Sequence, residues 1–347
     1  MNLYKFLTIS FLAIMLVSCN GENSSTKRNF SLEISGNKKE FKVNEDFNIE
    51  IKNKNKIEID KIEYDLAGEK IEVNNNTVSL KDAKLGKQEL IATIYYGDQS
   101  EKSVAHITVL SDKAPVIYTY KIINEYPHDV KSFTQGLEFY KDTLYESTGK
   151  HGQSYIRKLD YKTGQVYKQV DLDNIYFGEG ITILNNKIYQ LTWQKGIGFV
   201  YDIHTFEQLE TFKYTNSKEG WGLCNDGKKI FKSDGTEKIW FLNPETLVEE
   251  DYIQTVTNGS VFNKANELEY VDGKIYANVW QKDSAMIIDA HTGAILGVID
   301  FRGLKDMVTK HPNLDVLNGI AYNSTSKTFF ITGKNWDKLF EVEISEK

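Results

Sequence analysis

Cysteine and proline are scarce in this sequence of 347 residues, and basic residues are not in surplus. It has two cysteines and four prolines, and its formal net charge at pH 7 is −7. With two cysteines, no CxxC motif and no histidine-rich cluster, a zinc site has no obvious ligands, and we predict no metal site. An acidic chain lacks the basic face that a nucleic-acid partner requires. What is present, 12% aromatic and 26% charged residues, is typical of a folded globular protein.

The first residues carry an export signal rather than part of the fold. The apolar run over 6–17 has signal-peptide length and is too short to span a membrane comfortably. It ends in Leu-Val-Ser-Cys, which resembles a bacterial lipobox, so we predict a lipoprotein signal peptide over 1–18 and lipidation of Cys19. The alternative is a plain secretory signal followed by a chance cysteine. Polar residues 19–28 then form a tether, and the expected location is the bacterial cell envelope, periplasmic or at the cell surface, with the lipid holding the chain on the membrane.

Residues 29–111 have the pattern of a small all-β domain. Apolar and polar residues alternate over 30–34, 47–51, 78–80, 89–96 and 104–110, with Asn, Gly and Lys turns between them. Short alternating strands of this kind predict an immunoglobulin-like β-sandwich. The segment has no catalytic constellation, so we expect a spacer or docking module between the lipid anchor and the main domain.

The sequence repeats from residue 116 to the C-terminus. Five segments align, with equivalent positions at 135, 179, 221, 266 and 318, so the spacings are 44, 42, 45 and 52 residues. Each unit has three strands and a fourth after a turn, and four-stranded repeats of this length predict a five-bladed β-propeller over 116–347. The last unit ends after three strands. The unassigned strand over 116–123 is available to complete it and to close the ring.

The repeat aligns the residues that begin each inner strand, at one mouth of the central channel. These residues are Gln135, Glu179, Trp221, Asn266 and Asn318. Four of them precede a glycine, which lets the inner strands crowd around the axis. Glu179 is the only acid in this ring.

Loops between second and third strands open on the same face as the ring. Trp193, Trp280 and Lys334 lie in these loops, and Phe133 and Phe177 each stand two residues before an inner-strand start. Taken singly, each Trp is as well explained by packing between blades, and Lys334 by a solvated loop. Aromatic rings gathered on one face with amides, one acid and one lysine fit a ligand pocket better.

Eight motifs occur in order along the repeat. They include Phe-Thr-Gln-Gly-Leu at 133–137, Phe-Gly-Glu-Gly-Ile at 177–181, Glu-Gly-Trp-Gly-Leu at 219–223, Asn-Glu-Leu-Glu at 266–269 and Thr-Gly-Lys at 332–334. Together they resemble the motifs of the plant-type glutaminyl-peptide cyclotransferases, a family with bacterial members, over about residues 117–347. The resemblance implies a zinc-independent aminoacyltransferase on a five-bladed propeller. Such an enzyme converts the N-terminal Gln of peptides and proteins to pyroglutamate and releases ammonia.

The resemblance also assigns roles by motif position. It makes Glu179 the acid/base residue and Gln135, Asn266 and Lys334 polar substrate contacts. The aromatic pocket is formed by Trp193, Trp221, Trp280, Phe133 and Phe177. We place Lys334 with Glu179 as catalytic, and Asn318 among the substrate-binding residues.

The chemistry needs these groups. The α-amine attacks the side-chain amide of its own residue, so the pocket mainly has to hold the ring-closing geometry. A carboxyl group among Trp rings has a raised pKa and suits a proton shuttle from the amine to the leaving ammonia. Lys334, Gln135 or Asn266 could donate to the oxyanion, and the sequence does not rank them.

Two other functions stay open: a non-catalytic envelope lipoprotein whose propeller binds a peptide or glycan, and a scaffold that docks another protein. We expect no cofactor, although Glu138, Glu267 and Glu269 on inner strands are either structural or hold a cation such as calcium in the channel. Cys224 lies in an apolar stretch and is expected to be a buried structural thiol. The histidines are expected mostly at the surface. A closed propeller has few exposed edges, which favours a monomer.

Overall fold

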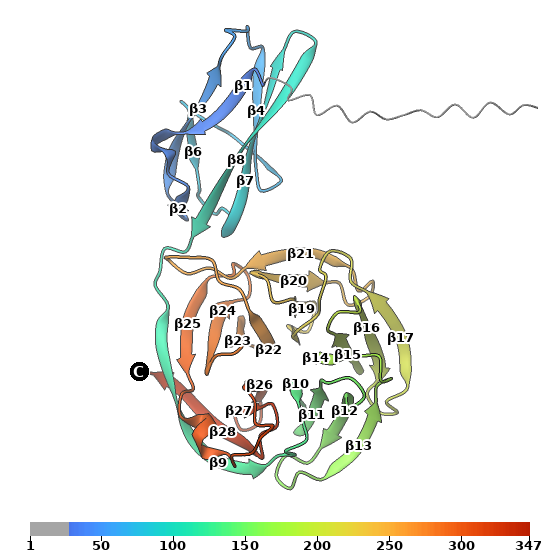
Figure 1. Cartoon of the computed structure of the whole chain (residues 1–347). Coiled ribbons are helices and arrows are strands. Elements are labelled where there is room, and N and C mark those ends of the chain that lie inside the picture. Colours follow the sequence, from blue (N-terminus) through green and yellow to red (C-terminus); the bar gives the residue numbers. More distant parts are fainter. Residues whose placement is uncertain (1–27) are drawn as a thin grey trace, which may run out of the picture.

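The computed structural model describes residues 28–347. The predicted signal peptide over 1–18, the predicted lipidation of Cys19 and nearly all of the tether lie outside the described residues. Between 28 and 347 the chain forms 28 strands and two short 3-10 helices, η1 (Ser35–Asn37) and η2 (Leu304–Met307). No helix in this range is long and apolar enough to cross a membrane. Figure 1 shows a smaller β domain beside a ring of sheets.

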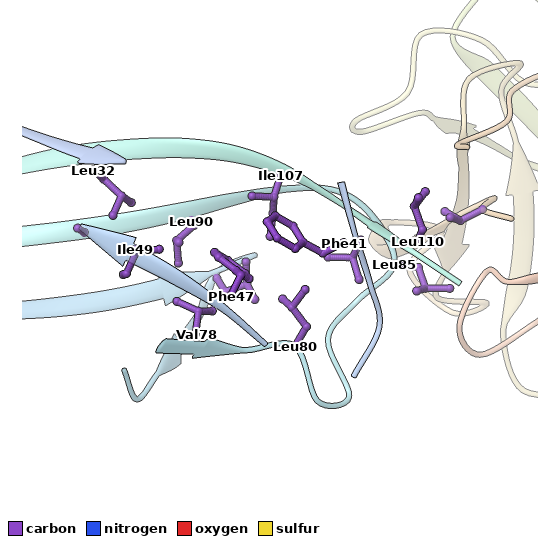
Figure 2. Close-up of a cluster of buried hydrophobic side chains, with 14 of the residues drawn as sticks. Leu32, Phe41, Phe47, Ile49, Val78, Leu80, Leu85, Leu90, Ile107 and Leu110 are labelled. Carbon is purple, nitrogen blue, oxygen red and sulfur yellow. The ribbon is translucent and has the colours of Figure 1, made fainter. Parts of the chain in front are cut away.

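Two sheets form the smaller domain. One has the order β1 (Phe30–Ile34), β3 (Asp46–Asn53), β6 (Thr77–Ser79), and the other has the order β2 (Glu40–Lys42), β8 (Gln99–Leu110), β7 (Gly86–Tyr96), β4 (Lys61–Leu66), β5 (Glu69–Ile71). Burial alternates along β3 and β7, as expected for strands with one face on a core. Apolar side chains of both sheets, among them Phe47, Leu90 and Ile107, meet in one cluster (Figure 2). The sequence pattern missed β2, β4 and β5.

Three four-stranded antiparallel sheets form most of the ring. They are β10 (Thr134–Tyr140), β11 (Thr143–Thr148), β12 (Tyr155–Leu159), β13 (Val166–Asp171); β14 (Gly178–Leu184), β15 (Lys187–Thr192), β16 (Ile197–Asp202), β17 (Gln208–Lys213); and β18 (Leu223–Asn225), β19 (Ile230–Ser233), β20 (Lys238–Leu242), β21 (Glu249–Gln254). The remaining strands form one larger sheet. Its order is β22 (Ala265–Val271), β23 (Lys274–Val279), β24 (Ser284–Asp289), β25 (Ile295–Asp300), β9 (Val116–Pro127), β28 (Lys338–Glu346), β27 (Thr328–Gly333), β26 (Leu317–Asn323).

Strand β9 joins the beginning of the ring to its end. It pairs antiparallel with β28 over almost its whole length, from Pro127 opposite Lys338 to Tyr118 opposite Glu346. The prediction that the strand beginning at residue 116 completes the last unit is therefore confirmed, and the strand is longer than expected. Residues 116–118 also pair in parallel with β25, which merges the last two four-stranded units into one sheet.

The inner strands β10, β14, β18, β22 and β26 crowd around the axis as the glycines predicted (Figure 1). A Cβ added to Gly180 would lie 2.6 Å from the Cα of Gly222, and one added to Gly222 would lie 2.0 Å from the carbonyl oxygen of Asn266. No side chain fits at such distances, so glycine is required at both positions. Glu179 and Trp221 stand directly before these two glycines, where the inner strands come together.

The smaller domain is docked against the ring. Val256, in the segment after β21, is fully buried and belongs to the core cluster of the smaller domain. The side-chain amide of Gln254 donates to the carbonyl of Lys87 at 3.0 Å and accepts from its N–H at 2.9 Å. Lys84 pairs with Asp251 at 3.1 Å. Apolar burial and paired backbone groups together hold the two parts in contact.

Candidate active site

Glu179 is a buried acid with one unpaired oxygen. Its side chain projects from β14, and only 4% of the residue is exposed. Oε1 accepts a hydrogen bond from Nε2 of Gln135 at 3.1 Å, whereas Oε2 has no hydrogen-bond partner among the described residues. Burial raises the pKa of Glu179 well above its usual value, Lys334 opposes the rise, and the charge of Glu219 adds to it. A buried carboxyl with a raised pKa and a free oxygen is suited to exchange a proton with a bound molecule.

Lys334 follows β27 and is also buried. Desolvation lowers the pKa of its ammonium group, while Glu179 and Asp315 act against that effect. Its Nζ lies 4.8 Å from the centre of the Phe133 ring. Between residues 28 and 347, no hydrogen bond is formed by this Nζ, so its cationic charge is available to a ligand in the site.

Asn318, Gln135 and Glu179, which all begin inner strands, are joined by hydrogen bonds into a chain of two amides and one acid. Nδ2 of Asn318 donates to Oε1 of Gln135 and to the carbonyl of Thr134, both at 3.0 Å. This fixes the Gln135 amide with its NH₂ group toward Glu179. Asn318 is fully buried, and through this chain it contacts the site by way of Gln135. The carboxamide of Asn266, also buried, has no hydrogen-bond partner in the described part of the chain.

Five aromatic residues form two groups at this mouth. Phe177 lies 6.1 Å from Phe133 and 5.5 Å from Trp193 between ring centres, and Trp221 lies 5.7 Å from Trp280. All five are only partly buried, as expected for the wall of an open site. The structure thus brings together the aromatic residues that the sequence placed on one face.

Glu219 is a residue of this site to which the sequence analysis assigned no role. Its Oε2 accepts the indole N–H of Trp193 at 2.8 Å and that of Trp221 at 2.9 Å, so it connects the two aromatic groups. The available signal was its place as the first residue of the Glu-Gly-Trp-Gly-Leu motif at 219–223. It is not an inner-strand start, so the repeat alignment could not single it out.

The acids Glu138, Glu267 and Glu269 lie on the inner strands β10 and β22. Glu267 accepts backbone N–H groups of Leu137 at 3.2 Å and Ile320 at 2.8 Å, and so bridges β10 and β26. Burial raises the pKa of Glu138 to about 8 and raises the pKa values of Glu267 and Glu269 well above the usual range. These contacts support the structural interpretation. Among residues 28–347, no three His, Cys, Asp or Glu side chains are grouped in a way that could hold a metal ion.

Two further residues bear on the sequence predictions. Cys224 is a free, buried cysteine, and burial together with the channel acids raises the pKa of its thiol well above the usual value, which disfavours a nucleophilic thiolate. His128 is not at the surface. It is buried between Glu146, with Nε2 and Oε1 3.0 Å apart, and the carbonyl of Trp336, 2.8 Å from Nδ1.

Fold and site together define an all-β, propeller-like protein with a desolvated carboxyl group, a lysine and oriented amides inside an aromatic mouth. Residues 90–344 match the family model described as glutamine cyclotransferase. A glutaminyl-peptide cyclotransferase of Arabidopsis thaliana is 41% identical over 229 residues, which are 65% of this chain and 71% of that protein. The crystal structure of Myxococcus xanthus glutaminyl cyclase superposes with a TM-score of 0.62 at 36% identity, covering 67% of this chain and 99% of that one.

The chain belongs to the glutamine cyclotransferase family. The resemblance to this family that the motifs indicated is therefore confirmed. The family match begins at residue 90, inside β7, and so reaches further toward the N-terminus than the start near 117 that the motifs suggested.

Proposed function

We propose that this protein is a glutaminyl-peptide cyclotransferase, with Glu179 as the proton shuttle. It acts on peptides and proteins with an N-terminal Gln and releases pyroglutamyl products and ammonia. The observation that carries the proposal is the buried Glu179 carboxyl, with one oxygen held by Gln135 and the other unpaired, in a member of this family. Family membership supports the reaction, and the geometry supports the role of the acid.

The reaction needs one group that carries a proton from the attacking nitrogen to the leaving nitrogen. The α-nitrogen of the substrate, whose pKa is about 8 and which is therefore partly neutral at pH 7, attacks Cδ of its own side chain. A C–N bond forms, and Glu179 takes a proton from the attacking nitrogen. It passes the proton to the side-chain nitrogen, and the bond from Cδ to that nitrogen breaks as ammonia leaves. The raised pKa of Glu179 supports both halves of this transfer, because it brings the proton affinity of the carboxylate closer to that of the nitrogen that gives up the proton.

Lys334 supports the charge that develops on the carbonyl oxygen. Its ammonium has no hydrogen-bond partner among the described residues, and it is desolvated, which strengthens its attraction for an oxyanion. The unpartnered amide of Asn266 is a second donor. The aromatic residues exclude water and press the side chain of the substrate toward its own amine.

We further propose the finer architecture and setting. The ring is a five-bladed β-propeller over 116–347, closed by β9, and the two-sheet domain over 29–111 is immunoglobulin-like. The enzyme needs no zinc or other cofactor and works as a monomer. It is exported, lipid-anchored through Cys19 and located in the cell envelope, where the docked smaller domain sets the position of the ring relative to the membrane. The contacts of Val256 and Gln254 with the smaller domain support this role.

A direct assay tests the activity. A soluble protein that starts at residue 28 is incubated with a Gln-initiated peptide, and the peptide mass is followed for the loss of one ammonia. We expect rapid loss with the wild-type chain and almost none with Glu179→Gln, while the exposed-surface control Glu210→Gln keeps full activity. A folded wild-type protein that does not accelerate the reaction would refute the enzyme and favour a binding propeller. A fully active Glu179→Gln variant would show that another group carries the proton.

A further inference from the structure

The Glu219 carboxylate collects contacts from two different sheets. Its Oε2 accepts the indole N–H of Trp193, which follows β15, and the indole N–H of Trp221, which precedes β18. Its Oε1 accepts from Nε2 of Gln194 at 3.3 Å. A tryptophan has one hydrogen-bond donor, so one oxygen fixes the orientation of both indole rings.

The backbone at Glu219 is itself held from beneath. Lys232, whose side chain is fully buried, donates from Nζ to the carbonyl of Glu219 at 2.7 Å and pairs with Glu249 at 3.1 Å. Glu249 in turn accepts the backbone N–H groups of Asn216 at 2.6 Å and Ser217 at 2.8 Å. The segment that carries Glu219 is therefore tied to β19 and β21, and its carboxylate has little freedom to move.

The two indoles belong to the two aromatic groups of the mouth. Trp193 contacts Phe177, and Trp221 contacts Trp280. Stacked and edge contacts between rings are weak individually and permit sliding. The shared hydrogen-bond acceptor is a direct link between the two groups.

We infer that Glu219 is a positioning residue: it joins the two aromatic groups into one wall and thereby sets the shape of the site for the substrate side chain. This inference rests on the proposed cyclotransferase function. Glu219 acts through the tryptophans, and no proton transfer is assigned to it.

The charge of Glu219 gives the inference a second, separable consequence. The charged groups that act on Glu179 are Lys334, which favours its ionised form, and Glu219, which disfavours it. Neutralising Glu219 removes one of the two effects that raise the pKa of Glu179, while burial still raises it and Lys334 still lowers it. The pKa of Glu179 then falls, and the limb of the pH profile of kcat/KM that reports Glu179 moves to lower pH.

Three variants separate shape from charge. Glu219→Ala leaves both indole N–H groups without an acceptor. We expect KM to rise about tenfold with a smaller change in kcat, since losing the partner of a partly buried donor has a cost of this order. Glu219→Gln keeps one acceptor oxygen, so its KM should stay within about threefold of the wild-type value. The limb of the pH profile that reports Glu179 should still shift, because the charge of Glu219 is gone. Glu210→Gln removes an exposed acid elsewhere and serves as the matched control.

A double-mutant cycle identifies the route of action. Trp193→Phe removes one indole N–H and keeps an aromatic ring, so its effect on KM should be strongly non-additive with that of Glu219→Ala. Additive effects would overturn the inference, as would a Glu219→Ala variant with unchanged KM, or a Glu219→Gln variant as impaired as Glu219→Ala. Thermal unfolding of each variant separates repositioning from loss of the fold. An inactive wild-type protein would instead refute the proposed function, and a changed tryptophan fluorescence of folded Glu219→Ala would still report on the wall.

Discussion

Two buried lysines of this protein should respond in opposite ways to the same substitution. Lys334 and Lys232 are both almost completely buried, and desolvation lowers the pKa of each. Nζ of Lys232 has three partners, Ser217 Oγ, the Glu219 carbonyl and Glu249, whereas Nζ of Lys334 has none in the described chain. Methionine has a similar length and no charge, so Lys→Met changes the electrostatics more than the packing.

For Lys334→Met we expect a large loss of activity without loss of stability. Removing one oxyanion donor costs about 10²- to 10³-fold in kcat. The unpaired ammonium contributes no hydrogen bond to the fold, and burying it is costly, so the free energy of unfolding should stay within about 1 kcal/mol of wild type or rise. For Lys232→Met, Glu249 is left buried without its cation, and the expected loss of stability is about 3–5 kcal/mol.

The assay pairs urea unfolding with cyclisation of a Gln-initiated peptide, measured on both variants under the same conditions. The reasoning is refuted if Lys334→Met keeps wild-type kcat/KM, because the lysine then does not act on the reaction. It is equally refuted if Lys334→Met is destabilised as much as Lys232→Met, because the ammonium would then have partners that the geometry does not provide. Refolding of Lys232→Met at low temperature would show whether activity returns with the fold.

Three further outcomes are expected. Burial would raise the pKa of Glu146, but Arg157 and His128 hold that pKa well below its usual range. The ion cluster therefore stabilises the fold at pH values above the ordinary carboxyl pKa of about 4.3, and this contribution is lost as the pH falls below it. Unfolding free energies between pH 3 and 7 should accordingly show a weaker acid dependence in Glu146→Gln than in wild type, and equal slopes would contradict the argument. Val256→Asp puts a charge into the core of the smaller domain, which should loosen its docking on the ring. We expect faster proteolysis between residues 111 and 116, with cyclisation retained. Unchanged cleavage would mean that the docking does not depend on this side chain. Cys19→Ser should abolish incorporation of labelled palmitate in a bacterial host, and persistent labelling would place the lipid elsewhere.

The candidate site was largely predictable because the repeat places equivalent residues at equivalent positions. Aligning five units identified Gln135, Glu179 and Asn318 before any distance was known, and the structure joins these three by hydrogen bonds. Glu219 could not be found in this way. It lies outside the aligned position, and its importance depends on two indoles that come from loops 28 residues apart in sequence.

The smaller domain shows where pattern reading fails. Its long strands β7 and β8 alternate clearly, whereas β2 and β5 have three residues each, which is too short for a period of two to be visible. Its docking was also invisible. Val256 is one apolar residue in a connecting segment, and only the fold places it in the core of a domain more than a hundred residues away.

The sequence by itself determined the repeat, the strand that completes its last unit and the single acid among the residues that begin the inner strands, because periodic strands and close-packed glycines are local requirements. The tertiary structure alone decided which oxygen of Glu179 is paired, which of two buried lysines lacks a partner, and which acid holds two tryptophans together. These depend on burial and on angles between groups from different sheets, and no local pattern encodes them.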